Sequence, residues 1–337
     1  MLQLSFRASL SLIHAMPIRL GDCEYCTMLH LILGRHLPDT TQKSSLKRVP
    51  FVLFPGVVKH TKDASDRFPV LLIGKSNRRG LLMEDNLHEV AKVMGVNERD
   101  VSALSKIPFE GNMMNPWGDE FPGVFRTLGL TPHKTVLDIP CGQGGVSVHL
   151  AREYGVTVDG YDLVQGFVEK ANEHAASCRV RELCEYHVGD IRAALGKGKE
   201  YDLLLWSAPP HIWENYKRTI ENLRRCVKHG GYLVIADAYL YSDEHKATYP
   251  DYETLSETVE AFTEFGDRVV QCHDYRDALW AKNYRTDKEA VEAAIENAES
   301  LEERESLMRY LEELTESESA DIECLGLYLA VLQIQKM

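Results

Sequence analysis

The 337-residue sequence lacks any run of about 18 consecutive apolar residues, which is the length that a membrane-spanning helix requires. It also lacks an internal repeat and a secretory apolar segment with a cleavage site, and its eight cysteines follow no regular spacing. Irregularly spaced cysteines are typical of reduced thiols rather than of a disulfide framework. With 44% hydrophobic and 26% charged residues, the composition predicts a globular cytoplasmic protein that has no membrane partner.

Positive charge is scarce outside the N-terminal part of the chain. The net charge is −13, yet residues 1–80 contain 12 Lys and Arg against 5 Asp and Glu. The acidic remainder argues against a broad nucleic-acid surface, because phosphate binding requires clustered Lys and Arg. We interpret the basic segment as a solvated face, although contact with an anionic partner stays open.

The N-terminal region, residues 1–107, has no clear role. Its patterns predict two short strands and two short helices, at 51–54, 68–73, 86–94 and 97–107. Neither helix is basic, which disfavours DNA binding. Cys23, Cys26 and His30 resemble half of a zinc site, but a structural site needs four ligands, so no metal site is predicted.

From residue 108 to 337, strand and helix patterns alternate, which predicts an α/β domain with helices on both faces of a parallel sheet. The expected strands are 135–139, 156–162, 184–188, 201–207 and 232–237, with a turn at Gly230–Gly231 before the last of them. The expected helices are 146–154, 166–176 and 252–265, followed by a strongly acidic and mostly helical stretch at 286–320.

A glycine-rich turn containing Gly142 and Gly144 joins the first of these strands to the helix that follows. Glycine lets the backbone approach a ligand closely because no Cβ intervenes, and a helix start offers free N–H groups. Many nucleotide-binding folds have such a turn, so on its own it is weak evidence.

Polar residues also end the neighbouring strands. Asp162 ends the second strand, Asp190 and Ile191 follow the third, and Ser207 ends the fourth. Ligands of open α/β sheets bind beyond the carboxyl ends of the strands, so these side chains are expected to share one crevice. A carboxylate after the second strand suits ribose hydroxyls, and one after the third can accept a hydrogen bond from an adenine amino group.

This series of motifs resembles the class I S-adenosylmethionine-dependent methyltransferase family over residues 115–240, although Pro140 stands where the family usually has glycine. The resemblance implies a Rossmann-like α/β fold with a seven-stranded, mostly parallel sheet and a reversed last strand. Residues 268–273 and 325–335 would form the two final strands, and 276–320 would be a helical insertion or lid between them.

The resemblance also implies S-adenosyl-L-methionine as the cofactor. Asp138 would orient the glycine turn or the methionine amino group, Asp162 would hold the ribose, and Asp190 with Ile191 would hold the adenine. Residues 115–118 resemble the segment that closes over the cofactor in small-molecule members, so Trp117 would cover the methionine end. The predicted cofactor-binding set is Trp117, Asp138, Gly142, Gly144, Asp162, Asp190, Ile191 and Ser207.

Residues 207–211 lie where the methyl acceptor should sit. They only partly resemble the Pro-Pro-aromatic motif of amino-group methyltransferases, because Ala208 intervenes and His211 replaces the aromatic residue. His211 is the predicted catalytic base, since an imidazole can take up a proton near neutral pH. Aromatic residues at 239–252 and 273–284 can form a lid around a small apolar or cationic acceptor.

We therefore expect a methyltransferase that moves a methyl group to a small-molecule acceptor by in-line displacement. The alternative enzyme is an NAD(P)-dependent oxidoreductase, whose G-x-G-x-x-G fingerprint is only partly met because Ser147 stands at the last position. A non-catalytic interaction protein that keeps the fold and docks through the basic N-terminal part also stays open. The oligomeric state is open as well.

Overall fold

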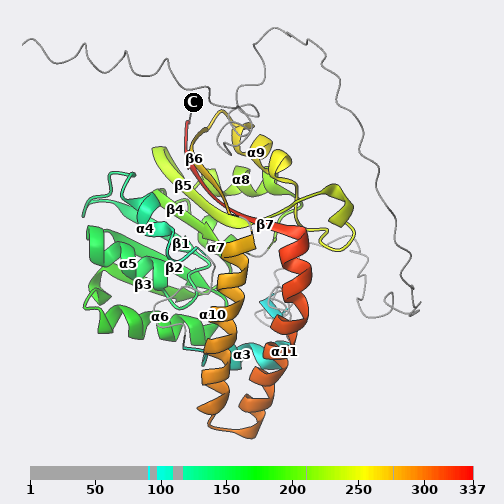
Figure 1. Cartoon of the computed structure of the whole chain (residues 1–337). Coiled ribbons are helices and arrows are strands. Elements are labelled where there is room, and N and C mark those ends of the chain that lie inside the picture. The colour runs from blue at the N-terminus through cyan, green and yellow to red at the C-terminus, as the bar shows by residue number, and fades with distance from the viewer. Residues whose placement is uncertain (1–89, 92–96, 109–116, 210, 276, 337) are drawn as a thin grey trace, which may run out of the picture. The chain divides into compact units, whose positions relative to one another are not determined.

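Seven strands form one sheet at the centre of the computed structural model, in the order β3-β2-β1-β4-β5-β7-β6 (Figure 1). The structure describes residues 90–91, 97–108, 117–209, 211–275 and 277–336. The strands are β1 Thr135–Ile139, β2 Thr157–Asp162, β3 Cys184–Val188, β4 Tyr201–Ser207, β5 Val227–Leu240, β6 Arg268–Tyr275 and β7 Leu325–Gln333. Every strand expected between residues 135 and 335 is therefore confirmed.

The direction of the strands also agrees with the expected fold. Strands β1 to β5 run parallel to one another, and β7 runs antiparallel to both β5 and β6. The predicted turn at Gly230–Gly231 is wrong, because both glycines lie within β5. The backbone N–H of Gly230 donates to the Ile334 carbonyl over 2.8 Å, and that of Ile334 donates to Gly231 over 2.9 Å. Pairing with the distant C-terminal segment keeps this stretch in the sheet.

Helices cover both faces of the sheet (Figure 1). Val136 and Val158 pack with α4, α5 and α6, whereas Leu137 and Tyr161 pack with α7, α8 and α9. Successive strand residues point to opposite faces, so a strand that is apolar throughout requires cover on both sides. The helices are α4 Phe121–Phe125, α5 Gly145–Tyr154, α6 Gln165–Ser177, α7 Ile191–Leu195, α8 Tyr216–Arg224 and α9 Leu255–Thr263.

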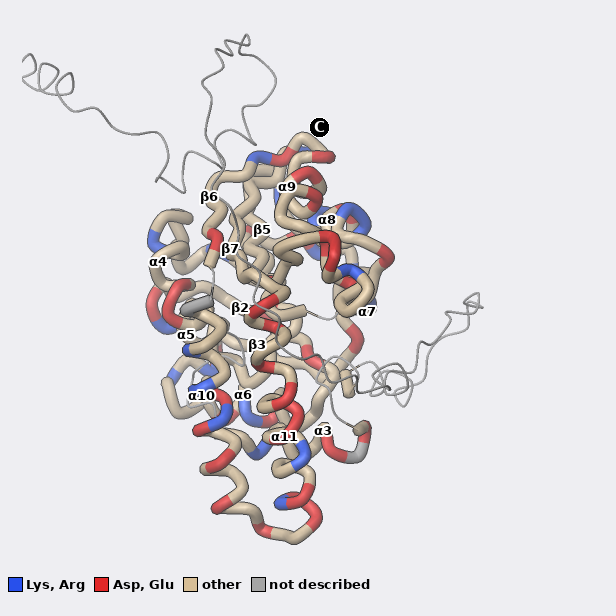
Figure 2. Tube along the Cα trace, turned by 45° about the vertical axis from the view of Figure 1, so that its right-hand side comes forward, with Lys and Arg blue, Asp and Glu red and all other residues tan. Residues whose placement is uncertain are grey.

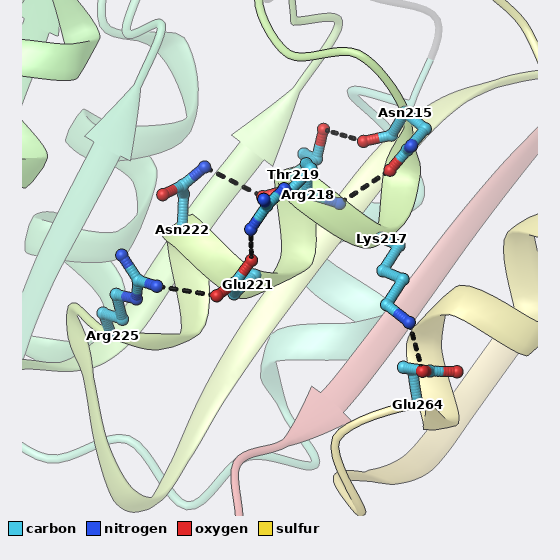
Figure 3. Close-up of polar contacts among 8 residues, drawn as sticks. All are labelled: Asn215, Lys217, Arg218, Thr219, Glu221, Asn222, Arg225 and Glu264. Atoms are coloured by element: carbon cyan, nitrogen blue, oxygen red, sulfur yellow. Dashed lines mark hydrogen bonds and ion pairs between the residues drawn. The ribbon is translucent and has the colours of Figure 1, made fainter.

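Helix α8 illustrates how the covering helices are held (Figure 3). The Asn215 side chain accepts a hydrogen bond of 2.9 Å from the backbone N–H of Arg218, which caps the start of the helix. Lys217 pairs with Glu264 at the end of α9, but both side chains are about half exposed. Exposed ion pairs contribute little, so the buried apolar face of α8 fixes its position.

A helical hairpin lies between β6 and β7 and confirms the expected helical insertion. Helices α10 Asp277–Glu296 and α11 Leu301–Cys324 run side by side, and Asp and Glu occur along both (Figures 1 and 2). The insertion reaches residue 324 rather than 320. Across the described ranges, no helix combines the length and the apolar character needed to cross a membrane.

A short N-terminal segment packs against this hairpin. It contains the 3-10 turn η1 Glu98–Asp100 and helix α3 Val101–Leu104, which lie inside the helix expected at 97–107. Asp100 is buried and accepts hydrogen bonds of 2.6 Å from both Arg309 and Ser306 of α11. The Arg309 hydrogen bond lowers the pKa of Asp100. The strands expected at 51–54 and 68–73 and the half zinc site at Cys23, Cys26 and His30 lie outside the described residues.

Candidate active site

A cavity of about 360 Å³ opens at the carboxyl ends of the parallel strands, where ligands of open α/β sheets bind. Residues at or after β1, β2, β4 and β5 form its floor, and α10, α11 and residue 90 contribute to its cover. The lining residues are Val90, Trp117, Asp138, Pro140, Cys141, Gly142, Gln143, Gly145, Val146, Asp162, Leu163, Val164, Phe167, Ile191, Ser207, Ala208, Pro209, Asp237, Ala238, Tyr252, Trp280, Tyr310 and Leu327.

Asp138 of β1 is a buried carboxylate in the wall of this cavity. The hydroxyl of Ser147, in the first turn of α5, donates a hydrogen bond to it. Burial raises the pKa of Asp138 to about 7, and the nearby Asp162 carboxylate adds to that shift. A carboxyl group that titrates near neutrality in a cavity is typical of a functional site.

Asp162, the last residue of β2, shapes the glycine-rich turn. Its carboxylate accepts the backbone N–H of Gly142 and that of Val164, each over 2.9 Å. Gly142 has a φ of 50°, a left-handed conformation that glycine adopts without strain. Burial raises the pKa of Asp162 to about 6, against the opposing effect of these two hydrogen bonds. The carboxylate thus connects the turn after β1 to the start of α6.

Ser207 and Ala208, at the end of β4, form the middle of the cavity floor. The Ser207 hydroxyl is buried and has no hydrogen-bond partner among the described residues. Ala208 has a φ of 44°, which is rare for a residue with a Cβ, and its N–H donates to the Ala236 carbonyl over 2.9 Å. Strained backbone of this kind clusters at functional sites.

The structure brings most of the predicted cofactor-binding residues to one cavity. Trp117, Asp138, Asp162, Ile191 and Ser207 line it and are buried, and Gly142 lines it in a partly exposed position. Two predicted residues are absent from the wall. Asp190 accepts the backbone N–H of Arg192 as the cap of α7 and pairs with the Arg192 side chain. Gly144 has a φ of 77°, and a Cβ there would meet Tyr186 and Ala171 at about 3 Å, so it allows close packing.

His211, the predicted base, lies behind the wall rather than in it. Its Nε2 atom is buried, has no hydrogen-bond partner among the described residues and is 3.9 Å from Oδ2 of Asp237. Its ring packs edge-on against Tyr252 at 4.6 Å. Asp237 and Tyr252 both line the cavity, so His211 is one side chain away from it.

Asp237 of β5 is a site residue that the sequence analysis did not identify. Tyr216 and the backbone N–H of Ala238 donate hydrogen bonds to its carboxylate, and Tyr328 donates to Tyr216. Burial raises the pKa of Asp237, against the opposing effect of His211. The available signal was a carboxylate at the expected end of the fifth strand, the same position that Asp162 occupies in the second.

The cover of the cavity is aromatic. Of the residues expected to form an aromatic lid, Tyr252 and Trp280 line the cavity, and Tyr310 of α11, which was not predicted, joins them. The Trp280 indole N–H donates to the Leu325 carbonyl over 2.9 Å, and its ring stacks on Tyr284. Within the described part of the chain, no cluster of His, Cys, Asp and Glu has the arrangement of a metal site.

Similarity to known proteins agrees with this geometry. Residues 136–231 match a family model described as a methyltransferase domain. A crystal structure of an S-adenosylmethionine-dependent methyltransferase from Geobacter sulfurreducens, in complex with S-adenosyl-L-homocysteine, aligns with a TM-score of 0.59. It covers 69% of this chain and 98% of that one at 20% sequence identity. Residues 136–231 therefore form a methyltransferase domain, and the chain has the fold of the class I S-adenosylmethionine-dependent methyltransferases.

Curated relatives match this chain over shorter stretches than the solved structure does. The 2-methyl-6-phytyl-1,4-hydroquinone methyltransferase of Synechocystis is 36% identical over 110 residues, which is 32% of this chain and 33% of the relative. A hybrid polyketide–nonribosomal peptide synthetase of Thermothelomyces thermophilus is 27% identical over 168 residues, or 44% of this chain and 4% of the synthetase. The chain therefore spans about a third or less of the length of these relatives.

Proposed function

We propose that this methyltransferase uses S-adenosyl-L-methionine to methylate a small-molecule acceptor. The observation that carries the proposal is the cavity at the carboxyl ends of the strands, where three buried aspartates stand among apolar and aromatic side chains. Its volume of about 360 Å³ is in the range of small-molecule sites.

The residues of the cavity fit an adenosyl cofactor. The Ser207 hydroxyl is buried without a partner among the described residues, and Asp138 and Asp162 are buried carboxylates. The described lining includes no Lys or Arg that could neutralise them. Buried polar groups are usually hydrogen-bonded, so these groups favour a ligand with hydroxyl and ammonium donors.

We assign the cofactor contacts from this fit. Asp162 would hold the ribose hydroxyls, Ile191 would pack on the adenine, and Asp138 with Gly142 would face the methionine part. Trp117 would cover the methionine end. Gly144 would contribute by letting the glycine turn pack closely, and Asp190 would hold the adenine. When bound, the cofactor supplies an electrophilic methyl group carried on a sulfonium sulfur.

The remaining work of the protein is to orient the acceptor, exclude water and take up a proton. The aromatic cover formed by Tyr252, Trp280 and Tyr310 supports water exclusion. His211 remains the proposed base and would act through Asp237, which lies 3.9 Å from it and lines the cavity. The similarity to a 2-methyl-6-phytyl-1,4-hydroquinone methyltransferase supports a small organic acceptor. Six unpaired cysteines among the described residues support a cytoplasmic location.

A labelled-methyl assay on a metabolite extract tests the proposal. The full chain is incubated with S-adenosyl-L-methionine that carries an isotopic label on its methyl group. We expect the label to appear in a small organic product together with one equivalent of S-adenosyl-L-homocysteine. A protein that binds the cofactor but never yields S-adenosyl-L-homocysteine would support the non-catalytic alternative. Binding of reduced nicotinamide cofactor instead would support the oxidoreductase.

A further inference from the structure

One wall of the cavity is not used by the proposed cofactor contacts. It consists of Asp237, Ala238, Tyr252, Trp280 and Leu327, which we call the β5 wall. These residues come from β5, the segment before α9, α10 and β7. The wall is therefore assembled from the half of the sheet that lies beyond β4, away from the glycine turn.

The charge of the β5 wall comes from a single carboxylate. Asp237 is 4% exposed, and its two oxygens accept hydrogen bonds from neutral donors, the Tyr216 hydroxyl and the Ala238 N–H. Among the described residues, the basic side chain that pairs with Asp237 is His211, whose Nε2 lies 3.9 Å from Oδ2 of Asp237, outside hydrogen-bond distance. Each carboxylate oxygen has a second lone pair, so Asp237 can accept a further donor from the cavity.

The rest of the wall suits a positive charge. Tyr252 and Trp280 present aromatic side chains to the same cavity, and aromatic faces attract cations. Trp280 is held by its hydrogen bond to the Leu325 carbonyl and by stacking on Tyr284 at 5.7 Å, so this surface is preorganised. An anionic acceptor would face three aspartates with no Lys or Arg among the described lining residues.

We propose that the acceptor is an amine, which the β5 wall binds through an N–H donated to Asp237 and through the faces of Tyr252 and Trp280. The proposal rests on the function proposed above. Transfer to such a nitrogen forms one nitrogen–carbon bond, while the carbon–sulfur bond of the donor breaks and its electron pair stays on sulfur. The nitrogen, bound as an ammonium, first gives one proton to the Asp237–His211 pair, and this frees the lone pair that forms the new bond to the methyl carbon.

Matched probes that differ only in the recognised group test this proposal. The full chain is titrated with benzylamine, benzyl alcohol and phenylacetate, with and without saturating S-adenosyl-L-homocysteine. We expect benzylamine to bind at least ten-fold more tightly than benzyl alcohol and phenylacetate to bind most weakly. Equal binding of benzylamine and benzyl alcohol to the parent protein would overturn the proposal, and this comparison needs no variant.

Two variants locate the preference. Asp237→Asn should reduce the preference for benzylamine to less than two-fold, whereas Asp202→Asn, a carboxylate at the opposite edge of the sheet, should leave it intact. An Asp237→Asn protein that folds and retains the full preference would contradict the assignment. Binding of S-adenosyl-L-homocysteine is measured in the same titrations. If the parent protein does not bind S-adenosyl-L-homocysteine, the proposed function is refuted. If it binds S-adenosyl-L-homocysteine but does not prefer benzylamine, only the amine proposal is refuted.

Discussion

The carboxylates at the amino and carboxyl ends of the parallel strands, which we call the amino edge and the carboxyl edge of the sheet, differ in their partners and in the direction of their pKa shifts. At the amino edge, Asp202 at the start of β4 accepts hydrogen bonds from Lys134 and Lys228, of 2.9 and 2.8 Å. Although burial opposes the shift, these hydrogen bonds lower the pKa of Asp202. At the carboxyl edge, burial raises the pKa values of Asp138 and Asp162 to about 7 and about 6, and no described cationic side chain pairs with either.

This difference separates structural carboxylates from those available to a ligand. Asp267, before β6, also belongs to the ion-paired edge, because Arg224 binds both of its oxygens over 2.7 and 3.0 Å. An ion-paired carboxylate has its donors supplied by the protein and contributes to folding. A buried carboxylate without a cation costs stability when it ionises, and it is retained where a bound group supplies the missing positive charge.

The largest expected effect concerns the stability cost of Asp138. Its pKa is raised from 3.8 to about 7, so between these pH values the unfolded chain releases a proton that the folded chain keeps. The contribution of Asp138 to the free energy of unfolding therefore falls as pH rises, by about 2–4 kcal/mol. Asp138→Asn should become more stable relative to the parent as pH increases from 4 to 8, as measured by urea unfolding. If the difference in unfolding free energy between Asp138→Asn and the parent did not change with pH, the proposed difference between the two edges of the sheet would be wrong.

A smaller effect is expected on cofactor affinity. Asp162→Asn removes the charge that we assign to the ribose hydroxyls, and hydrogen bonds to a charged group contribute about 1.5–3 kcal/mol. We therefore expect the affinity for S-adenosyl-L-homocysteine to fall by about 10- to 100-fold at pH 8, measured by calorimetry. Asn keeps only one of the two oxygens that accept the Gly142 and Val164 N–H groups, so urea unfolding of the variant at the same pH is measured as the control for folding. An unchanged affinity would mean that this carboxylate has no role in binding.

The smallest effect is expected for a substitution at the amino edge, Asp202→Asn. Asp202→Asn removes an ion-paired group whose lysines are 43% exposed, so screening limits the loss of stability to about 1–2 kcal/mol at pH 7. Because the pKa of Asp202 is lowered in the folded state, this contribution is present above the ordinary pKa of 3.8 and disappears as pH falls below it. Cofactor affinity should stay within two-fold of the parent. A large loss of binding in this variant would show that the two edges are not independent.

Much of the fold could be predicted because it depends on local sequence. The strand at 135–139 is a mostly apolar run that contains β-branched residues. The glycine turn follows this strand, and Asp162 ends the next one, at the spacing of a βαβ unit. The role of Gly144 was harder to predict, because its close neighbours Tyr186 and Ala171 are known only once β3 and α6 pack against it. The turn expected at Gly230–Gly231 failed for the same reason, since its partner Ile334 lies about a hundred residues away.

The acceptor side of the site was less predictable than the cofactor side. Tyr216 of α8 donates to Asp237, Tyr328 of β7 donates to Tyr216, and His211, which follows β4, lies 3.9 Å from the carboxylate. No local motif reports such an assembly of distant segments. Sequence patterns therefore identified the glycine turn and the strand-end aspartate Asp162, whereas the β5 wall required the folded structure.

The most direct test of the carboxyl-edge site is calorimetric titration of the full chain with S-adenosyl-L-homocysteine at pH 5.5 and pH 8, each in two buffers of different ionisation enthalpy. We predict that one molecule binds per chain, that binding is tighter at pH 8, and that binding at pH 5.5 releases protons. The reason is that the ligand ammonium favours the ionised forms of Asp138 and Asp162, whose pKa values are about 7 and about 6. Absence of binding, or binding that is independent of pH and buffer, would contradict the account.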